Sequence, residues 1–190
     1  NIKRALSITL QLIEMGVPLV IDLNMKDEAD RRGIEINENL FSKMLEVDVV
    51  STIAVQKKGI SSLKKVLSHP RISSFAFSYD PDIERHISEI EPLLPESNIS
   101  RRSLALMLLS GDETLRDWLL KNLKEDNISL IESIRDRAAE KYSVSLSYII
   151  SQQRLKAVDS ISDKILTKTA SEKRRVAGVL DEMTIDPVLG

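Results

Sequence analysis

One stretch of the sequence has the residue types and the spacing to recognise a purine base. Asn24 and Asp27 stand three residues apart and follow a short, largely apolar run at Val17–Leu23. A carboxylate at Asp27 can accept two hydrogen bonds, from the N1–H and the 2-amino group of guanine, and adenine does not offer this pair of donors. The Asn24 amide can brace a neighbouring loop and reach the edge of the base. The simpler interpretation is a polar turn after a strand, and the tetrad alone does not decide between the two.

A second loop follows in the order and spacing that guanine recognition needs. Ser51–Ala54 comes after the apolar run Val47–Val50, so both loops would leave the carboxyl ends of neighbouring strands, where ligands bind in open α/β sheets. Guanine-binding domains place a loop of small residues here, so that a backbone N–H approaches the purine O6, and Ala54 is the candidate for that contact. No residue is assigned a catalytic or metal-binding role, and the candidate guanine-binding residues are Asn24, Met25, Lys26, Asp27, Ser51, Thr52, Ile53 and Ala54.

The surrounding pattern predicts a small α/β lobe that positions both loops. Gly16 stands where a left-handed helix cap belongs, and Pro18 prevents that helix from continuing. A short apolar run covered on both faces is typical of a buried parallel strand. We therefore predict two parallel strands with helices, a partial Ras-like nucleotide-binding lobe over residues 1–70. Its helices are expected at 3–15, about 38–45 and from 60 to Pro70, and its strands at 17–23 and 47–50.

After Pro70 the sequence pattern changes from that of an α/β lobe to a linker followed by helices. Residues 71–80 read as an extended linker, and Asp80-Pro81 is a good helix start, with a capping carboxylate before a proline at the first helical position. Helical periodicity then continues through 81–168 without a recognisable strand, which predicts an all-α regulatory domain. Residues 169–190 read as a charged tail. Helix is expected to dominate the chain overall.

Composition excludes several classes of function. The 190 residues include 42% hydrophobic residues, no cysteine and a formal charge of −2 without a basic stripe, which argues against thiolate metal sites and nucleic-acid binding. His69 and His86 are the only histidines, and we expect His86 on the outer face of its helix. No apolar run reaches the roughly 18–20 residues needed to span a bilayer, so this part of the protein is expected to be soluble.

The chain resembles the ferrous-iron transport protein B (FeoB) family. The resemblance is most specific in residues 1–36, where Asn24-Met25-Lys26-Asp27 has the Asn-Met-x-Asp form of that family. It extends to Leu108-Leu109-Ser110-Gly111-Asp112 in the helical part and to Pro187-Val188-Leu189-Gly190, although Asp186 stands where the family often has His. The matching positions before the tetrad are Asn1, Arg4, Leu6, Thr9, Gln11, Leu12, Glu14, Gly16 and Pro18.

The resemblance implies a cytosolic portion of a GTP-dependent ferrous iron transporter. GTP or GDP with Mg²⁺ would bind the intact protein, which would hydrolyse GTP at the cytoplasmic face of the cell membrane. The helical region would act like a nucleotide-dissociation inhibitor. The expected partners are the N-terminal half of the G domain, the membrane permease domain of the same protein and a second copy paired through an exposed strand edge.

The printed sequence contains no Gly-x-x-x-x-Gly-Lys-Ser/Thr loop and no switch segments, so it has base-reading residues without phosphate-reading ones. This leaves a rival hypothesis open, in which the chain is a helical interaction module with no nucleotide chemistry.

The 190-residue chain alone is expected to bind GDP very weakly and to hydrolyse no GTP. Phosphate and Mg²⁺ contacts supply most of the affinity of GTPases for nucleotides, and the groups that make them are not among these residues. Calorimetric titration with GDP measures this directly, and micromolar or tighter binding would contradict the expectation.

Overall fold

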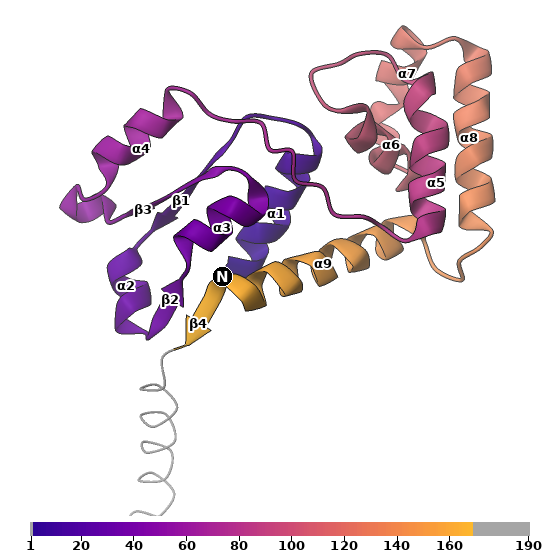
Figure 1. Cartoon of the computed structure of the whole chain (residues 1–190). Helices are drawn as coiled ribbons and strands as arrows, with labels where there is room; N and C mark the ends of the chain where they lie inside the picture. The colour runs from indigo at the N-terminus through magenta and orange to yellow at the C-terminus, as the bar shows by residue number, and fades with distance from the viewer. Residues whose placement is uncertain (1, 169–190) are drawn as a thin grey trace, which may run out of the picture. The chain divides into compact units, whose positions relative to one another are not determined.

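The computed structural model describes residues 2–168, and the tail predicted at 169–190 lies outside the described residues. The described chain divides into two compact units (Figure 1). One comprises residues 20–71 and 163–168 and is called the α/β unit below; the other comprises residues 2–19 and 72–162 and is called the helical unit. The predicted combination of a small α/β lobe with a helical part is confirmed.

The α/β unit is organised around two parallel strands, as predicted. In β1 and β3, Val20 stands opposite Asp48 and Asn24 opposite Thr52. Helices α3 and α4 pack against β3, and Phe41, Leu45 and Val47 are buried. The elements are β1 (Val20–Asn24), α2 (Lys26–Arg31), β2 (Ile34–Ile36), α3 (Glu38–Leu45), β3 (Asp48–Thr52), a 3₁₀ turn (Ala54–Gln56), α4 (Ile60–Leu67) and β4 (Leu166–Lys168).

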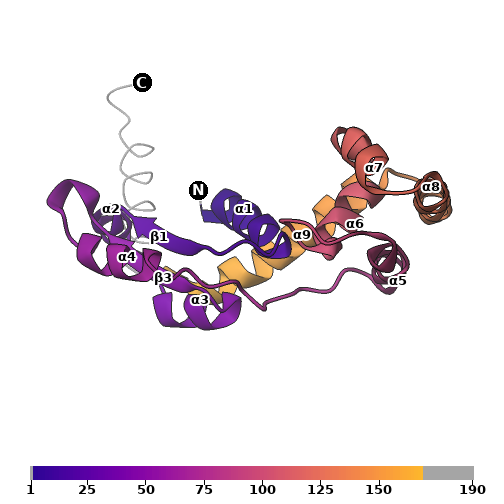
Figure 2. The ribbon, with the colours of Figure 1, turned by 90° about the horizontal axis from the view of Figure 1, so that it is seen from above.

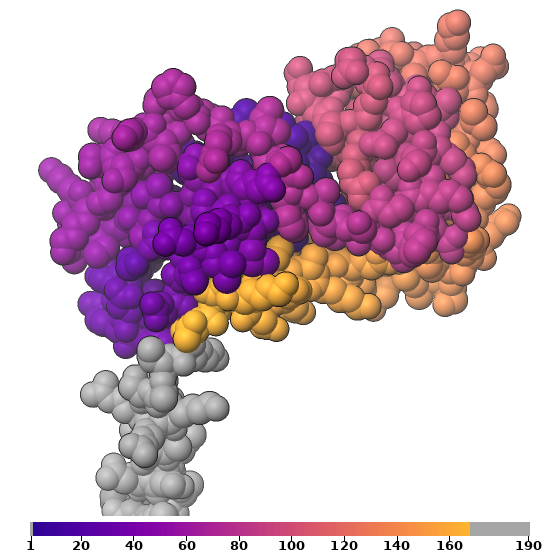
Figure 3. Space-filling view, viewed as in Figure 1, coloured from indigo at the N-terminus to yellow at the C-terminus, as the bar shows by residue number. Residues whose placement is uncertain are grey.

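A second pair of strands corrects the prediction that residues 81–168 contain no strand. β2 and β4 pair antiparallel, with Ile36 opposite Leu166, and Figure 1 draws them side by side. In Figure 3 the yellow atoms at the end of the described chain lie against purple atoms of the α/β unit. The Asn37 N–H adds a hydrogen bond of 2.8 Å to the Ile165 carbonyl. The helix predicted to continue to residue 168 therefore ends at Ile165, because the chain beyond it pairs with a strand far away in sequence.

β1 is less buried than predicted. None of its residues is fully buried, and Asp22 and Asn24 are exposed. Asp22 and Asn24 share one face of the strand because side chains alternate across a sheet. The expectation that both faces of this strand are covered is therefore wrong. Along its edges, β1 pairs with β3 alone among the described residues.

The helical unit has a continuous apolar core. α5 packs against both α6 and α8, and Figure 2 shows α5 and α8 nearly end-on. Ile83, Ile87 and Ile90 of α5 are inaccessible to solvent, and Trp118 packs against the same core. The helices are α1 (Ile2–Glu14), α5 (Pro81–Ile90), α6 (Arg101–Leu109), α7 (Arg116–Asn122), α8 (Glu125–Ala139) and α9 (Leu146–Ile165, which ends in the α/β unit), with 3₁₀ turns at Glu91–Leu93 and Glu113–Leu115.

His86 corrects another prediction. Its exposed fraction is only 4%, so it does not lie on an outer face of α5. One turn further on, Glu89 Oε2 lies 3.5 Å from its Nδ1 atom. Within residues 2–168, no group of three or more histidine, cysteine or acidic side chains is placed to hold a metal ion. None of the described helices combines the length and apolarity required to cross a bilayer.

The division by packing differs from the boundaries expected from the sequence, because α1 packs with the helical unit rather than with the α/β unit. Gly16, with a φ of 71°, ends this helix as expected. The Ser100 N–H donates to the Met15 carbonyl at 2.9 Å. Tyr79, although in the segment expected to be a linker, is 4% exposed and donates from its hydroxyl to Glu14 Oε1 at 2.5 Å.

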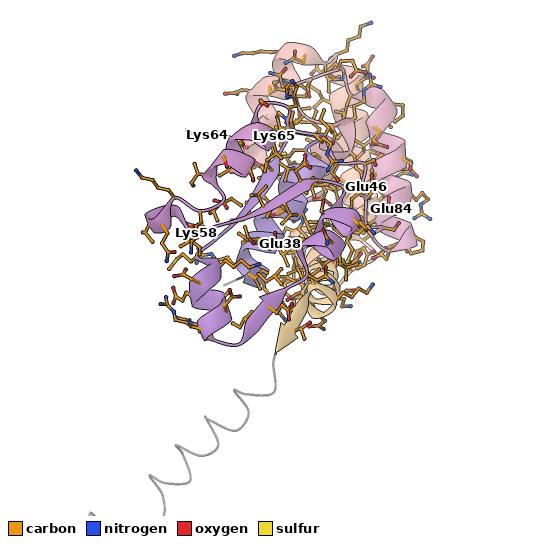
Figure 4. All side chains as sticks on the ribbon, turned by 60° about the vertical axis from the view of Figure 1, so that its left-hand side comes forward. Glu38, Glu46, Lys58, Lys64, Lys65 and Glu84 are labelled. Atoms are coloured by element: carbon orange, nitrogen blue, oxygen red, sulfur yellow. The ribbon has the colours of Figure 1, made fainter. Side chains whose placement is uncertain are left out.

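Tyr79 belongs to a polar network in the helical unit. Arg154 lies 2.9 Å from Glu14, and the exposed fractions of these side chains are only 15% and 8%. Burial, reinforced by the nearby Glu14 charge, raises the pKa of Tyr79 far above its ordinary value, so its hydroxyl remains a donor. Glu84 accepts from the Tyr79 N–H at 2.7 Å and forms a bidentate pair with Arg102 at 2.6 and 2.7 Å (Figure 4 labels Glu84). The network joins α1, α5, α6 and α9.

Asp80 caps α5 as predicted. Its Oδ1 atom accepts hydrogen bonds from the N–H groups of Asp82 and Ile83, both at 3.0 Å, and Pro81 occupies the first helical position. The Tyr142 hydroxyl lies 3.1 Å from both carboxylate oxygens. Partial burial by itself would raise the pKa of Asp80, but the hydrogen bonds that the carboxylate accepts outweigh it and lower the pKa below 3.8.

Asp80→Ala is expected to destabilise the helical unit by about 2 kcal/mol, at the upper end for a helix cap, because the carboxylate also serves Tyr142. Urea unfolding followed by Trp118 fluorescence reports on this unit. Asp80→Asn keeps an acceptor oxygen and should cost less. A folded-state pKa below the unfolded one means that the stabilisation is present above about pH 4 and is lost as the pH falls through the folded pKa, so the two curves should converge in acid. Equal stability of wild type and Asp80→Ala at pH 7 would contradict this.

The 190-residue chain is expected to self-associate through β1. One edge of this strand pairs with β3, and an open strand edge is a template for pairing with another chain. Light scattering should show a molar mass that rises with concentration, and amide exchange along 20–24 should slow in parallel. A monodisperse monomer at high concentration with protected β1 amides would contradict this.

Candidate nucleotide-binding site

The ends of β1 and β3 bring the two predicted loops together. Asn24 and Thr52 are opposite each other at the carboxyl ends of the parallel strands. The residues after Asn24 and after Thr52 therefore start from neighbouring points on one edge of the sheet. This is the edge at which open α/β sheets bind their ligands.

The Asn24 side chain connects the two loops directly. Its Oδ1 atom accepts from the Met25 N–H at 2.8 Å and from the Ala54 N–H at 3.2 Å. The Thr52 hydroxyl, 1% exposed, lies 2.8 Å from Asp22 Oδ1 and 3.3 Å from Asn24 Oδ1. Since a hydroxyl has one proton, the shorter contact to Asp22 is the stronger hydrogen bond. The role predicted for Asn24, bracing the neighbouring loop, is the one that these distances describe.

Asp27 lies in the first turn of a short helix that begins abruptly. Met25 has left-handed backbone angles (φ 64°, ψ 38°), and α2 starts at the next residue. Asp27 Oδ2 lies 3.5 Å from Arg31, whose side chain is 73% exposed. An exposed pair of this kind contributes little to stability. The carboxylate is therefore held near the loop by its place on α2, and it can exchange the exposed arginine for another donor.

The second loop closes tightly on the end of β3. Ile53 and Lys58 exchange backbone hydrogen bonds of 3.1 and 3.3 Å. Gly59 follows with a φ of 78°, and a Cβ atom there would lie 2.3 Å from the Ser51 carbonyl oxygen. Only glycine fits this position, so the loop conformation depends on it. Ala54, predicted to offer its N–H to the purine O6, donates that N–H to Asn24 in this structure.

Lys26 and Ser51 meet on a residue that the sequence did not single out. Glu38 Oε1 accepts from the Lys26 ammonium at 2.8 Å and from the Ser51 hydroxyl at 2.7 Å. Partial burial opposes ionisation of Glu38, but both hydrogen bonds lower its pKa; its bond in turn raises the pKa of Lys26. In the sequence, Asn37-Glu38 is an ordinary helix start, so no local signal distinguishes Glu38 from other first-turn acids.

Comparisons with known proteins match both parts of the chain to one family. The family model "Ferrous iron transport protein B" matches residues 1–67, and the model "FeoB cytosolic helical domain" matches residues 79–167. The Fe(2+) transporter FeoB of Salmonella typhimurium is 25% identical over 205 residues, and that of Escherichia coli K12 is 24% identical over 195. Each alignment covers 100% of this chain and 24% of the relative, so the chain spans about a quarter of their length.

Solved structures share the fold. The GDP-bound G-domain of an S. thermophilus FeoB variant has a TM-score of 0.77 at 28% identity, covering 88% of this chain and 66% of that one. NFeoB from S. thermophilus bound to GDP, AlF4⁻ and K⁺ has a TM-score of 0.72 at 30% identity, covering 85% and 64%. The apo cytosolic domain of T. maritima FeoB has a TM-score of 0.70 at 21% identity, with coverage of 88% and 64%, and supports the fold alone.

These similarities confirm the predicted partial Ras-like lobe followed by a helical domain, and they do not favour the rival hypothesis of an interaction module without nucleotide chemistry. Two models of one family together match most of the chain, and solved G-domain structures share its architecture. The chain belongs to the FeoB family of ferrous iron transport proteins, as a portion of the cytosolic region that contains part of the G-domain and the helical domain.

Proposed function

We propose that the α/β unit forms the guanine-recognising side of the nucleotide site in a GTP-dependent ferrous iron transporter. The observation that carries the proposal is the Asn24 side chain, which joins the loop leading to Asp27 with the loop at Ala54. A base placed over this edge would meet the Asp27 carboxylate. Ferrous iron is proposed as the transported ion because the relatives are named Fe(2+) transporter FeoB.

The two base-reading loops would divide the work of recognition. Asp27 accepts from the N1–H and 2-amino group of guanine, which adenine cannot satisfy. Asn24 keeps Met25 and Ala54 at the base edge, with Lys26, Ser51, Thr52 and Ile53 completing the loops. For the Ala54 N–H to reach the purine O6, it has to exchange its bond with Asn24 Oδ1 for one with the base.

The phosphates and the Mg²⁺ of GTP are assigned to residues outside this chain. Similar solved structures contain FeoB proteins bound to GDP or to GDP with AlF4⁻, which is consistent with phosphoryl chemistry in the family. In the intact protein, the N-terminal half of the G domain would supply the phosphate loop and the switches, and would pair with β1. GTP hydrolysis is a property proposed for that complete site.

The proposed domain boundaries are supported by the ranges of the two family models. Residues 1–70 would be the C-terminal half of the G domain, 71–80 a linker and 81–168 a helical regulatory domain; the models match 1–67 and 79–167. Residues 169–190, outside the described range, would lead to a membrane permease domain. The whole region would then lie at the cytoplasmic face of the membrane and relay nucleotide state to the permease.

Asp27→Asn in the intact protein is expected to weaken GDP binding by about 1.5–3 kcal/mol, the value of a hydrogen bond to a charged group. Preference should shift toward xanthine nucleotides, because the new amide offers a donor to the 2-oxo group that replaces the 2-amino group of guanine. Fluorescent-nucleotide titrations with GDP and XDP measure both effects. Asp30→Asn, an exposed position on the same helix, is the matched control. Unchanged GDP affinity in Asp27→Asn would show that Asp27 does not read the base.

A further inference from the structure

Glu38 lies outside the residues that face a base, yet it contacts both loops that do. We propose that Glu38 is a positioning residue that clasps the two guanine-reading loops together and thereby slows guanine-nucleotide release. This inference rests on the proposed function. It adds a residue from a third segment of the chain, α3, to a site otherwise built from the ends of β1 and β3.

One carboxylate oxygen serves both loops. Glu38 Oε1 accepts at 2.8 Å from Lys26, which starts α2 next to Asp27, and at 2.7 Å from Ser51, near the end of β3 where the second loop begins. Lys26 and Ser51 therefore converge on a common acceptor rather than on each other. Without Glu38, the Lys26 ammonium and the Ser51 hydroxyl would lose the one charged acceptor that they share, and this contact between the loops would be lost.

The clasp differs from an isolated surface ion pair because the same Glu38 carboxylate oxygen also accepts from a hydroxyl. The side chain is 31% exposed, against 47% for Lys26, so the contact is partly screened from water. Hydrogen bonds with an ionised partner are shorter and stronger than neutral ones. Both partners are charged at neutral pH, and their hydrogen bond lowers the pKa of Glu38 and raises that of Lys26.

The backbone at Glu38 is held on both sides. Asn37 caps α3 by accepting from the Leu40 N–H at 2.9 Å, and its own N–H donates to the Ile165 carbonyl at 2.8 Å. Further along α3, Phe41 and Leu45 are buried. The carboxylate therefore projects from a fixed helix start, and it can define where Lys26 and Ser51 lie instead of following them.

Glu38 and Asn24 brace the same loops in different ways. Asn24 accepts from backbone N–H groups at the strand ends, so its loss would disturb the loop fold itself. Glu38 holds side chains, so its loss should leave the fold intact while the residue next to Asp27 loses its anchor. The expected consequence is faster nucleotide release and a higher KM, with kcat unchanged because no phosphate contact is involved.

Stopped-flow release of fluorescent GDP from the intact protein tests the clasp. Glu38→Ala is expected to release GDP about tenfold faster, equivalent to about 1.4 kcal/mol. Glu38→Gln, which keeps an acceptor oxygen without the charge, should fall between wild type and Glu38→Ala. GTP turnover should show the same rise in KM with kcat within about twofold of wild type. The matched control is Glu46→Gln, after the last residue of the same helix (Figure 4 labels both), and it should release GDP at the wild-type rate.

A double-mutant cycle with Ser51→Ala separates positioning from general loss of stability. If Ser51 acts through Glu38, the double variant will change the free energy of activation for GDP release by clearly less than the sum of the changes in Glu38→Ala and Ser51→Ala. Additive effects, or a release rate in Glu38→Ala and Glu38→Gln equal to that of Glu46→Gln, would overturn the proposal. If Glu38→Ala fails to fold, Glu38→Gln and Ser51→Ala carry the same test. Failure of wild type to bind GDP, or a silent Asp27→Asn, would instead overturn the proposed function.

Discussion

The carboxamide oxygen of Asn24 connects the two loops that form the proposed guanine-binding edge of this chain. It accepts from the Met25 and Ala54 N–H groups, and Ala54 is 30 residues away in sequence. Both donors follow the carboxyl ends of parallel strands. The oxygen therefore joins these two strand ends, which would otherwise be free to separate. From this junction the chain leaves the first strand through the left-handed turn at Met25, and it leaves the second loop through the tight turn at Gly59. The position of Asp27 follows from it, because α2 starts one residue after the turn.

Polar contacts perform two different tasks in the two units. In the α/β unit they are short-range braces on a partly exposed edge, where Glu38 supplements Asn24. In the helical unit the pair Glu14–Arg154 is almost fully buried and is satisfied by the Tyr79 hydroxyl. Removal of one member of a buried pair is far more costly than the pair's net contribution, because it leaves an uncompensated charge. The helical unit is therefore specified by polar contacts as well as by its apolar core.

Local features of the sequence predicted much of this structure. Gly16 ends α1, Asp80-Pro81 starts α5, and the Asn-x-x-Asp tetrad follows a strand, because each signal depends on residues within a few positions. β2 and β4 could not be predicted in this way, since each has three residues and its pairing partner is more than 100 residues away. The role of Glu38 could not be predicted for the same reason, because its partners Lys26 and Ser51 belong to other elements. The burial of His86 depends on helices packed around α5, which one helix's periodicity does not reveal.

The most direct measurement is a crystal structure of the intact cytosolic region with GDP. We expect both Asp27 carboxylate oxygens to lie within hydrogen-bond distance of N1 and N2 of guanine, Arg31 to have left Asp27, and Glu38 still to join Lys26 to Ser51. A base bound elsewhere, or an Asp27 that remains paired with Arg31 while the guanine edge faces solvent, would contradict this expectation.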